Sequence, residues 1–264
     1  MRTLNIKMLK NRQIRRILRS YPIPMELWEP VKDSCSVLQG LSAVEFAHLR
    51  ELVTMFLYKK RFTGVNGLQV TPEIMLNIAA QACLPILKLD LEYYSGWIEI
   101  ILYPNAFRIA RDKTDSDGIV HHEESTLRGE SWSRGPIVLS WGDIEQDLKR
   151  IYPGRNIVIH EFAHKLDLLN GSANGMPPLH SNMLHSLWTE TLQSAFEKIN
   201  QQVKEGVVTH IDPYAATEPG EFFAVVSEYF FAAPNLLFQQ CPDVYQQLKL
   251  FYRQDTLLRI DDIN

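Results

Sequence analysis

Apolar residues recur at helical spacing in two stretches of the first hundred residues. The first stretch begins at Ser42, where a serine cap and Glu45 at the third helical position form a capping box, and it runs to about Arg61. Its apolar positions are Phe46, Leu49, Val53, Phe56 and Leu57. The second stretch begins at Thr71, which is the cap and is followed by a proline at the first helical position. It runs to about Cys83. The pattern therefore predicts two helices in this part of the chain.

The pattern then changes to short apolar runs that are typical of strands. Residues 97–103 lie between Gly96 and Pro104 and predict one strand. Residues 136–141 predict another, and the proline at its start suits an edge position in a sheet. The polar stretch 111–130 between these strands is long enough to be a functional loop.

The second half of the chain has mainly helical patterns. We expect helices over 156–169, over 183–204, from about 217 to 232, and over about 244–252. The first of these ends at Asn170-Gly171, which is a C-cap signal. Neither an internal repeat nor a Gly/Ser linker interrupts the chain. The predicted architecture is α+β, with an N-terminal helical portion, a small sheet and a helical C-terminal half.

The composition is that of an ordinary globular protein. Of the 264 residues, 45% are hydrophobic and 22% are charged, which excludes intrinsic disorder and collagen-like chains. An apolar run long enough for a transmembrane helix is missing, and the N-terminus lacks the apolar core of a signal peptide. Three distant cysteines without CxxC spacing favour neither a disulfide framework nor a cysteine zinc site. We therefore expect a cytoplasmic protein without a membrane partner.

Positive charge is concentrated at the N-terminus. Residues 1–20 hold seven of the 27 Lys and Arg residues and no acidic residue. Such a segment can meet nucleic acid, an acidic partner or a membrane surface, but no nucleic-acid-binding motif follows it. We interpret residues 1–20 as a solvated basic extension and expect no direct contact with nucleic acid.

The strongest chemical signal is His160-Glu161-Phe162-Ala163-His164, an HExxH motif. On a helix, positions i and i+4 differ by about 40° in direction and about 6 Å in rise, so both imidazoles can reach one metal ion. Glu161 lies beside them and can act as the general base on a water molecule. Apolar residues surround the motif, and two bare histidines inside such a helix would be costly without a metal. The motif predicts one zinc ion per chain.

A catalytic zinc site also needs a third protein ligand. The apolar segment 221–231 offers Glu221 and Glu228, which are seven residues apart on one helix face, and spacing alone leaves either possible. Glu218 is a solvated candidate in the first turn of that helix, where a carboxylate also complements the helix dipole. Asp167 shares the face of the two histidines, and we expect it to hold a ligand imidazole by a hydrogen bond.

Three segments of the sequence resemble the Mlc titration factor A family of zinc metallopeptidases. They are GESWSRGPIVLSW at 129–141, HEFAHKLD at 160–167 and DPYAATEPGEFFAVVSEYFF at 212–231. The resemblance covers roughly residues 20–255. The helix pair is also similar to that of lethal-factor-type zinc peptidases, which share an HEFxHxxD-like motif and a tyrosine before an EFFA. The resemblance implies a zincin-like, gluzincin-type fold in which residues 21–264 form one domain, with a helical portion over about 21–90 and a catalytic core over about 91–255.

The resemblance also implies a role for each matching residue. His160, His164 and Glu221 would be the zinc ligands, Glu161 the catalytic base and Tyr214 the residue that stabilises the transition state. Glu228 would be a supporting acid.

A histidine of the loop before GESW would occupy the fourth zinc position. His121 is favoured over His122 by spacing, and such a ligand would displace water and silence the enzyme.

The expected activity is hydrolysis of peptides by a zinc-activated water, of the aminopeptidase type that the resemblance implies. The family's named role adds a partner, the transcriptional repressor Mlc, and with it an effect on the glucose phosphotransferase system. The alternative is a non-catalytic zinc protein that acts only by sequestering a transcription factor. Glu161 discriminates between the two, because a pure binding protein would not need a base beside the zinc.

Overall fold

The computed structural model describes residues 12–105, 110–114, 120–124, 135–149 and 153–261, without the side chains of 110–114, 120–124, 260 and 261. Its main sheet has three parallel strands in the order β1-β2-β5. The strands are β1 (Arg61–Gly64), β2 (Glu99–Tyr103) and β5 (Ile137–Ser140), with Arg61 opposite Glu99 and Ile100 opposite Ile137. β5 is therefore at an edge of the sheet, as the proline before it predicted. The other strands, β3 (Ala110–Thr114) and β4 (Val120–Glu124), form an antiparallel pair.

Two strand predictions need correction. The first predicted helix ends at Lys59, and Arg61 begins β1, which the sequence analysis missed. The polar stretch 111–130, which was expected to be a loop, contains most of the β3–β4 hairpin. Both errors have the same cause, because a short strand rich in polar or small residues does not show the apolar alternation that predicts strands.

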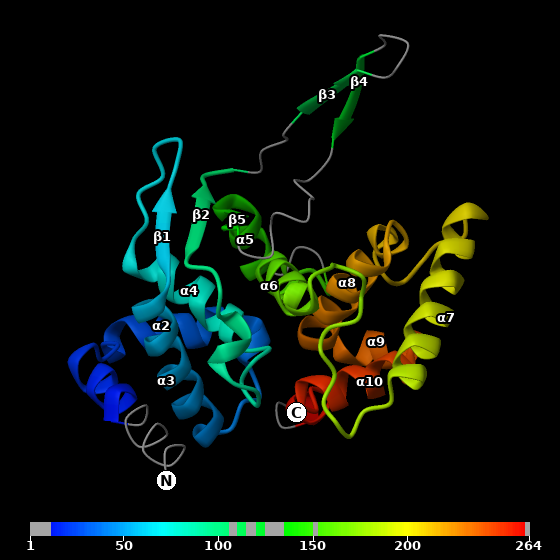
Figure 1. Ribbon diagram of the computed structural model, residues 1–264. Helices are drawn as coiled ribbons and strands as arrows, with labels where there is room; N and C mark the ends of the chain where they lie inside the picture. The colour runs from blue at the N-terminus through cyan, green and yellow to red at the C-terminus, as the bar shows by residue number, and fades with distance from the viewer. Residues whose placement is uncertain (1–11, 106–109, 115–119, 125–134, 150–152, 262–264) are drawn as a thin grey trace.

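The helices before α6 form one layer together with the sheet, and those after it form a second layer on the other side of α6 (Figure 1). The helices before α6 are the helical residues 12–20, α2 (Met25–Ser34), α3 (Ala43–Lys59), α4 (Pro72–Cys83) and α5 (Trp141–Leu148). Those from α6 onward are α6 (Ile157–Asp167), α7 (His185–Lys204), α8 (Pro219–Ala232), α9 (Pro234–Gln240), α10 (Pro242–Tyr252) and α11 (Leu258–Asp261). Short 3-10 turns are η1 (Ser36–Leu38), η2 (Leu91–Tyr94), η4 (Leu168–Asn170) and η5 (Pro213–Ala216). α6 lies between the two layers.

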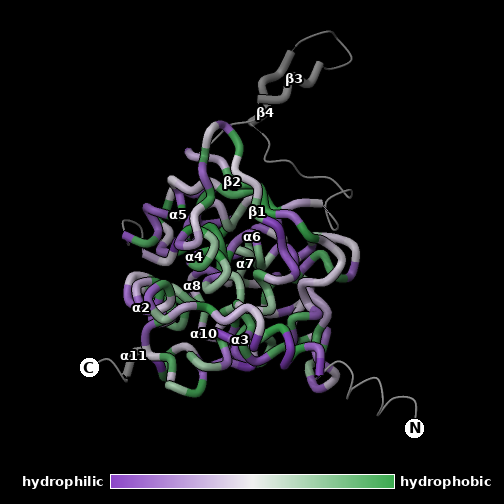
Figure 2. Tube along the Cα trace, turned by 90° about the vertical axis from the view of Figure 1, so that its left-hand side faces the viewer, coloured by the Kyte–Doolittle hydropathy of each residue, from purple (hydrophilic) through white to green (hydrophobic). Residues whose placement is uncertain are grey.

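Local sequence signals set several of these helix ends. The capping box at Ser42 and Glu45 is formed, and the Thr71 side chain accepts a hydrogen bond from the third residue of α4. Asn156 caps α6 in the same way, and Gly171 ends η4 in the left-handed conformation that favours glycine. Along most helices the hydropathy alternates between polar and apolar residues, as expected for helices with one buried face (Figure 2).

Helices α6 and α8 are among those that differ from this pattern, because they are buried on nearly all sides. α8 is buried from Gly220 to Phe231, and α6 is buried at most of its positions. Phe162 of α6 packs at ring-centroid distances of 5.0–5.8 Å against Phe56, Tyr94 and Trp97 in the N-terminal half. The core is therefore continuous across α6, so the packing holds this helix firmly in both directions.

The basic N-terminal segment is partly described. Residues 12–20 are helical, and Ile17 on this helix is buried with 5% exposure, while Arg12, Arg15, Arg16 and Arg19 are exposed. This part of the predicted extension is thus packed against the core by its apolar face. Over the described residues, no helix has the length and apolar character needed to cross a bilayer.

Candidate metal centre

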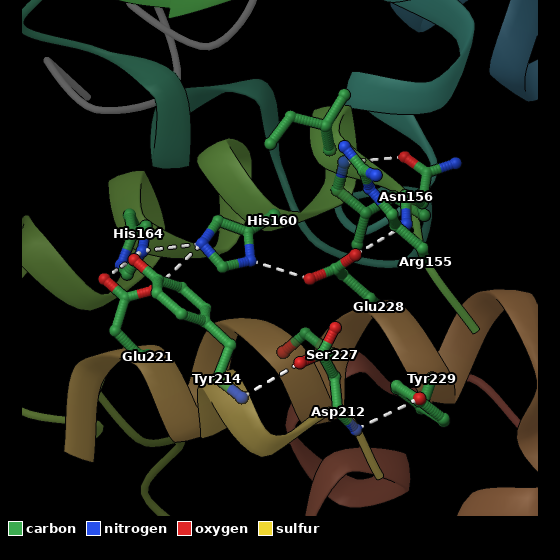
Figure 3. Close-up of polar contacts among 12 residues, drawn as sticks. Arg155, Asn156, His160, His164, Asp212, Tyr214, Glu221, Ser227, Glu228 and Tyr229 are labelled. Carbon is green, nitrogen blue, oxygen red and sulfur yellow. Dashed lines mark hydrogen bonds and ion pairs between the residues drawn. The ribbon is translucent and has the colours of Figure 1, made fainter. Parts of the chain in front are cut away.

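Three side chains from α6 and α8 converge on one point. The Nε2 atoms of His160 and His164 are 3.2 Å apart. One carboxylate oxygen of Glu221 lies 3.1 Å from His160 Nε2, and the other lies 3.2 Å from His164 Nε2 (Figure 3). All these possible ligand atoms lie within 4.8 Å of one another. The HExxH spacing and the apolar helix 219–232 thus bring together three of the residues that the sequence analysis singled out.

The spacing of these possible ligand atoms fits a zinc ion. Ligand atoms at about 2.0–2.1 Å from a tetrahedral zinc stand roughly 3.3–3.4 Å from one another. At the site, the two imidazole nitrogens are 3.2 Å apart, and the two oxygens of Glu221 lie 3.1 Å from one nitrogen and 3.2 Å from the other. Two imidazole nitrogens and one carboxylate are also a ligand set that zinc takes in catalytic sites.

Electrostatics in the site favour a cation. Burial alone would raise the pKa of Glu221, but hydrogen bonds from His160 and His164 hold it well below the ordinary value. Burial alone would lower the pKa of His160, but Glu228 and Glu221 outweigh it and raise the pKa well above the ordinary value. Buried carboxylates thus draw positive charge to this point, and a divalent cation can supply the same charge.

Glu228, the other carboxylate candidate on α8, lies on the opposite side of the His160 ring. Its Oε1 is 2.7 Å from Nδ1 of His160, and its Oε2 accepts a hydrogen bond of 2.5 Å from the backbone N–H of Asn156. A carboxylate at Nδ1 keeps the proton on that nitrogen, so Nε2 has a free lone pair on the side of Glu221 and His164. Glu218, the third candidate, is exposed and occupies the N-cap position of α8.

The prediction for Asp167 was wrong. Its carboxylate is fully buried and accepts a hydrogen bond of 2.7 Å from the backbone N–H of Gly175. Burial raises its pKa to about 6, and the backbone groups of the 174–176 turn counteract that rise. Asp167 therefore ties the end of α6 to the following turn, and Glu228 contacts the imidazole instead.

Glu161 is half-buried on the face of α6 that is turned toward β5. Lys165 is one helical turn further along the same face, and its Nζ donates a hydrogen bond of 2.9 Å to the carbonyl of Gly135, just before β5. This face of α6 is therefore held against the start of the edge strand.

Tyr214 lies in η5, which precedes α8. Its ring centroid is 6.1 Å from that of His160, and its side chain points toward His164 and Glu221 (Figure 3). Asp212 fixes the local turn, because its Oδ1 accepts a hydrogen bond of 2.9 Å from the Tyr214 N–H. The Asp212 N–H donates in turn to the hydroxyl of Tyr229 on α8. The side chain of Tyr214 is 39% exposed, so it is open to a bound molecule.

The proposed fourth ligand lies outside the described side chains. His121 and His122 are on β4, where they pair with Lys113 and Asp112, but only the backbone of this strand is described. The role of either histidine stays a prediction.

Two residues around the site were not recognised from the sequence. Asn156 was taken only as the start of a helix, although an asparagine at that place is a cap signal. Gln81 lies within the helix predicted from Thr71 to about Cys83 and was not singled out, although an uncharged polar residue among apolar ones is itself a signal of an internal hydrogen bond.

Comparison with known proteins places this site in a family. Residues 9–253 match the family described as glucose-regulated metallo-peptidase M90. The chain is also 40% identical over 229 residues to proteins named Mlc titration factor A from Yersinia pestis (strain Pestoides F) and Yersinia pseudotuberculosis (strain YPIII), with 85% of this chain and 83% of each relative covered. The chain therefore belongs to the Mlc titration factor A family, within the M90 metallopeptidases.

Proposed function

We propose that the chain is a cytoplasmic, zinc-dependent peptidase of the aminopeptidase type, with a zincin-like site formed by His160, His164 and Glu221. The observation that carries the proposal is the convergence of two imidazole Nε2 atoms, 3.2 Å apart, with the carboxylate of Glu221, one oxygen of which lies 3.1 Å from the first imidazole and the other 3.2 Å from the second. These spacings suit one tetrahedral zinc ion. When bound there, zinc would polarise a peptide carbonyl and lower the pKa of a bound water to about 7.

The residues around these three possible ligands supply the other parts of a hydrolytic site. Glu161 accepts a proton from the attacking water and returns it to the leaving amine. The edge strand β5 binds the backbone of an extended peptide, because none of the described strands pairs with its outer edge. This mode of binding involves main-chain groups, which suggests a loose preference for the substrate sequence.

Tyr214 is proposed to donate a hydrogen bond to the oxyanion that forms when the carbonyl is attacked. Tyr214→Phe should keep the zinc, because the hydroxyl is not one of the three ligands, yet lower kcat by about 100- to 1,000-fold, or about 2.7–4 kcal/mol. Steady-state kinetics together with zinc analysis check this expectation. Tyr93→Phe, at a half-buried position of η2 outside the site, is a control that should leave kcat unchanged. Unchanged turnover in Tyr214→Phe would assign the ring to packing alone.

A second function has support from the names of the relatives. Since proteins 40% identical to this chain are named Mlc titration factor A, we propose that the chain binds the repressor Mlc and so influences the glucose phosphotransferase system. Hydrolysis and binding can coexist on one chain. The alternative, a regulator that only sequesters Mlc, would leave Glu161 without a role.

The experiment that tests the proposed function measures zinc and hydrolysis in the same samples. The purified protein should contain about one zinc ion per chain and should cleave peptides with a free N-terminus. Removal of the metal by a chelator should abolish cleavage and lower the unfolding temperature, because an ion that binds only the folded state stabilises it, and added zinc should restore both. Cleavage that persists without metal would exclude this site as its source.

A further inference from the structure

A chain of buried hydrogen bonds runs from α4 to the candidate metal centre. Gln81 of α4 is 1% exposed, and its Oε1 accepts a hydrogen bond of 2.7 Å from Nδ2 of Asn156. The backbone N–H of Asn156 donates to Oε2 of Glu228, and Oε1 of Glu228 contacts Nδ1 of His160 (Figure 3). Asn156 and Glu228 are 4% and 6% exposed. Water therefore has little access to any of these groups.

The network has a single consistent assignment of donors and acceptors. Oδ1 of Asn156 must accept, because it lies 2.9 Å from the backbone N–H of Ile159, so its Nδ2 must donate to Gln81. The Nε2 of Gln81 donates in turn to the carbonyl of Asn77, at 3.1 Å. Neither amide can be flipped without setting two donors or two acceptors against each other.

We propose that Gln81 is a positioning residue of the metal centre, which acts through Asn156 and Glu228 on the imidazole of His160. The inference rests on the proposed function, since it assumes that His160 binds a metal. Gln81 links the N-terminal helices to the site, because it lies on α4, whereas Asn156, Glu228 and His160 lie at or after the start of α6.

The physical reason is the cost of a buried donor without an acceptor. If Gln81 loses its oxygen, Nδ2 of Asn156 must find another partner, and the asparagine moves together with the backbone N–H that holds Glu228. Partners that orient a metal-binding histidine matter for affinity as well as for structure, and their loss weakens metal binding by about 10- to 100-fold. Gln81 lies further from the ion than Glu228, so an effect of about tenfold is expected.

Two substitutions on the same helix separate positioning from simple packing. Gln81→Met keeps the length of the side chain but removes its hydrogen bonds. Asn77→Leu is the matched control, because Asn77 is also a buried amide of α4 but donates only to the carbonyl of Glu73, one turn back. The zinc dissociation constant of each protein is measured by competition with a chromophoric chelator, and the unfolding temperature of each metal-free protein is measured alongside.

The expected result is that both substitutions lower the unfolding temperature, whereas only Gln81→Met raises the zinc dissociation constant, by about tenfold. Equal dissociation constants for the two variants would overturn the proposal, and wild-type protein without zinc affinity would overturn the proposed function instead. If Gln81→Met does not fold, Gln81→Asn takes its place. It keeps the amide but is one methylene shorter, so it should lose the hydrogen bond to Asn156 and again weaken zinc binding. Zinc affinity unchanged in that variant would overturn the proposal equally.

Discussion

Glu161→Gln should abolish peptide hydrolysis and leave the zinc in place. The substitution keeps the size and the hydrogen-bonding shape of the side chain, but an amide cannot accept the proton of the attacking water. Loss of a general base costs about 100- to 10,000-fold in rate, and no ligand is removed. Zinc analysis and a peptide-cleavage assay on the same preparation measure both properties.

The controls for this variant test the two proposed functions separately. Glu190→Gln, at an exposed position of α7, makes the same chemical change away from the site and should have no effect. Glu161→Gln should still bind Mlc in a pull-down, because a protein interface depends on many surface residues rather than on one base. Full hydrolytic activity in Glu161→Gln would disprove the mechanism, and loss of Mlc binding with an intact fold would mean that the two functions share a surface.

Removal of a carboxylate from α8 should have very different effects at its two buried positions. Glu221→Ala deletes one of only three proposed protein ligands and leaves two imidazoles, so zinc should be lost at concentrations that saturate the wild type. Glu228→Ala removes a partner of His160 but no ligand, so zinc affinity should fall by about 10- to 100-fold. Competition titrations with a chelator rank the two variants.

Glu218→Ala completes this series. Glu218 is an exposed residue at the N-cap of the same helix, so the variant should bind zinc as the wild type does. Circular dichroism of the metal-free proteins checks that α8 is formed in all three variants. A greater loss of affinity in Glu228→Ala than in Glu221→Ala would show that Glu228 is the ligand.

Sequence reasoning was most successful where a local signal determines the structure. Ser42 and Thr71 cap the helices that their side chains predicted, because a cap depends on hydrogen bonds within one turn. The proximity of His160 and His164 follows from the helix itself. Their approach to Glu221 needed more than spacing, since the sequence alone left Glu221 and Glu228 open, and only the packing of α8 against α6 decides which oxygen atoms lie between the two imidazoles.

The features that were missed depend on contacts between distant segments. β1 exists because Arg61 and its neighbours pair with residues 99–102, and a four-residue strand has too few positions to show a period. Asp167 was assigned to the wrong partner because helical spacing shows which face a residue shares, but not that the 174–176 turn folds back onto it. The bond between Gln81 and Asn156 likewise joins two helices, and nothing in either local pattern specifies it.

The distribution of the possible ligands over α6 and α8 has a consequence for the synthesis of the chain. The two histidines are translated well before Glu221, so a growing chain carries an incomplete set of donors until α8 has emerged from the ribosome. α8 can bury its apolar residues only by packing against α6 and the helices around it, and its carboxylate reaches the histidines in that same step. A chain that ends before α8 therefore has no complete site, and the collapse that completes the core also marks the point at which the proposed zinc ligands first come together.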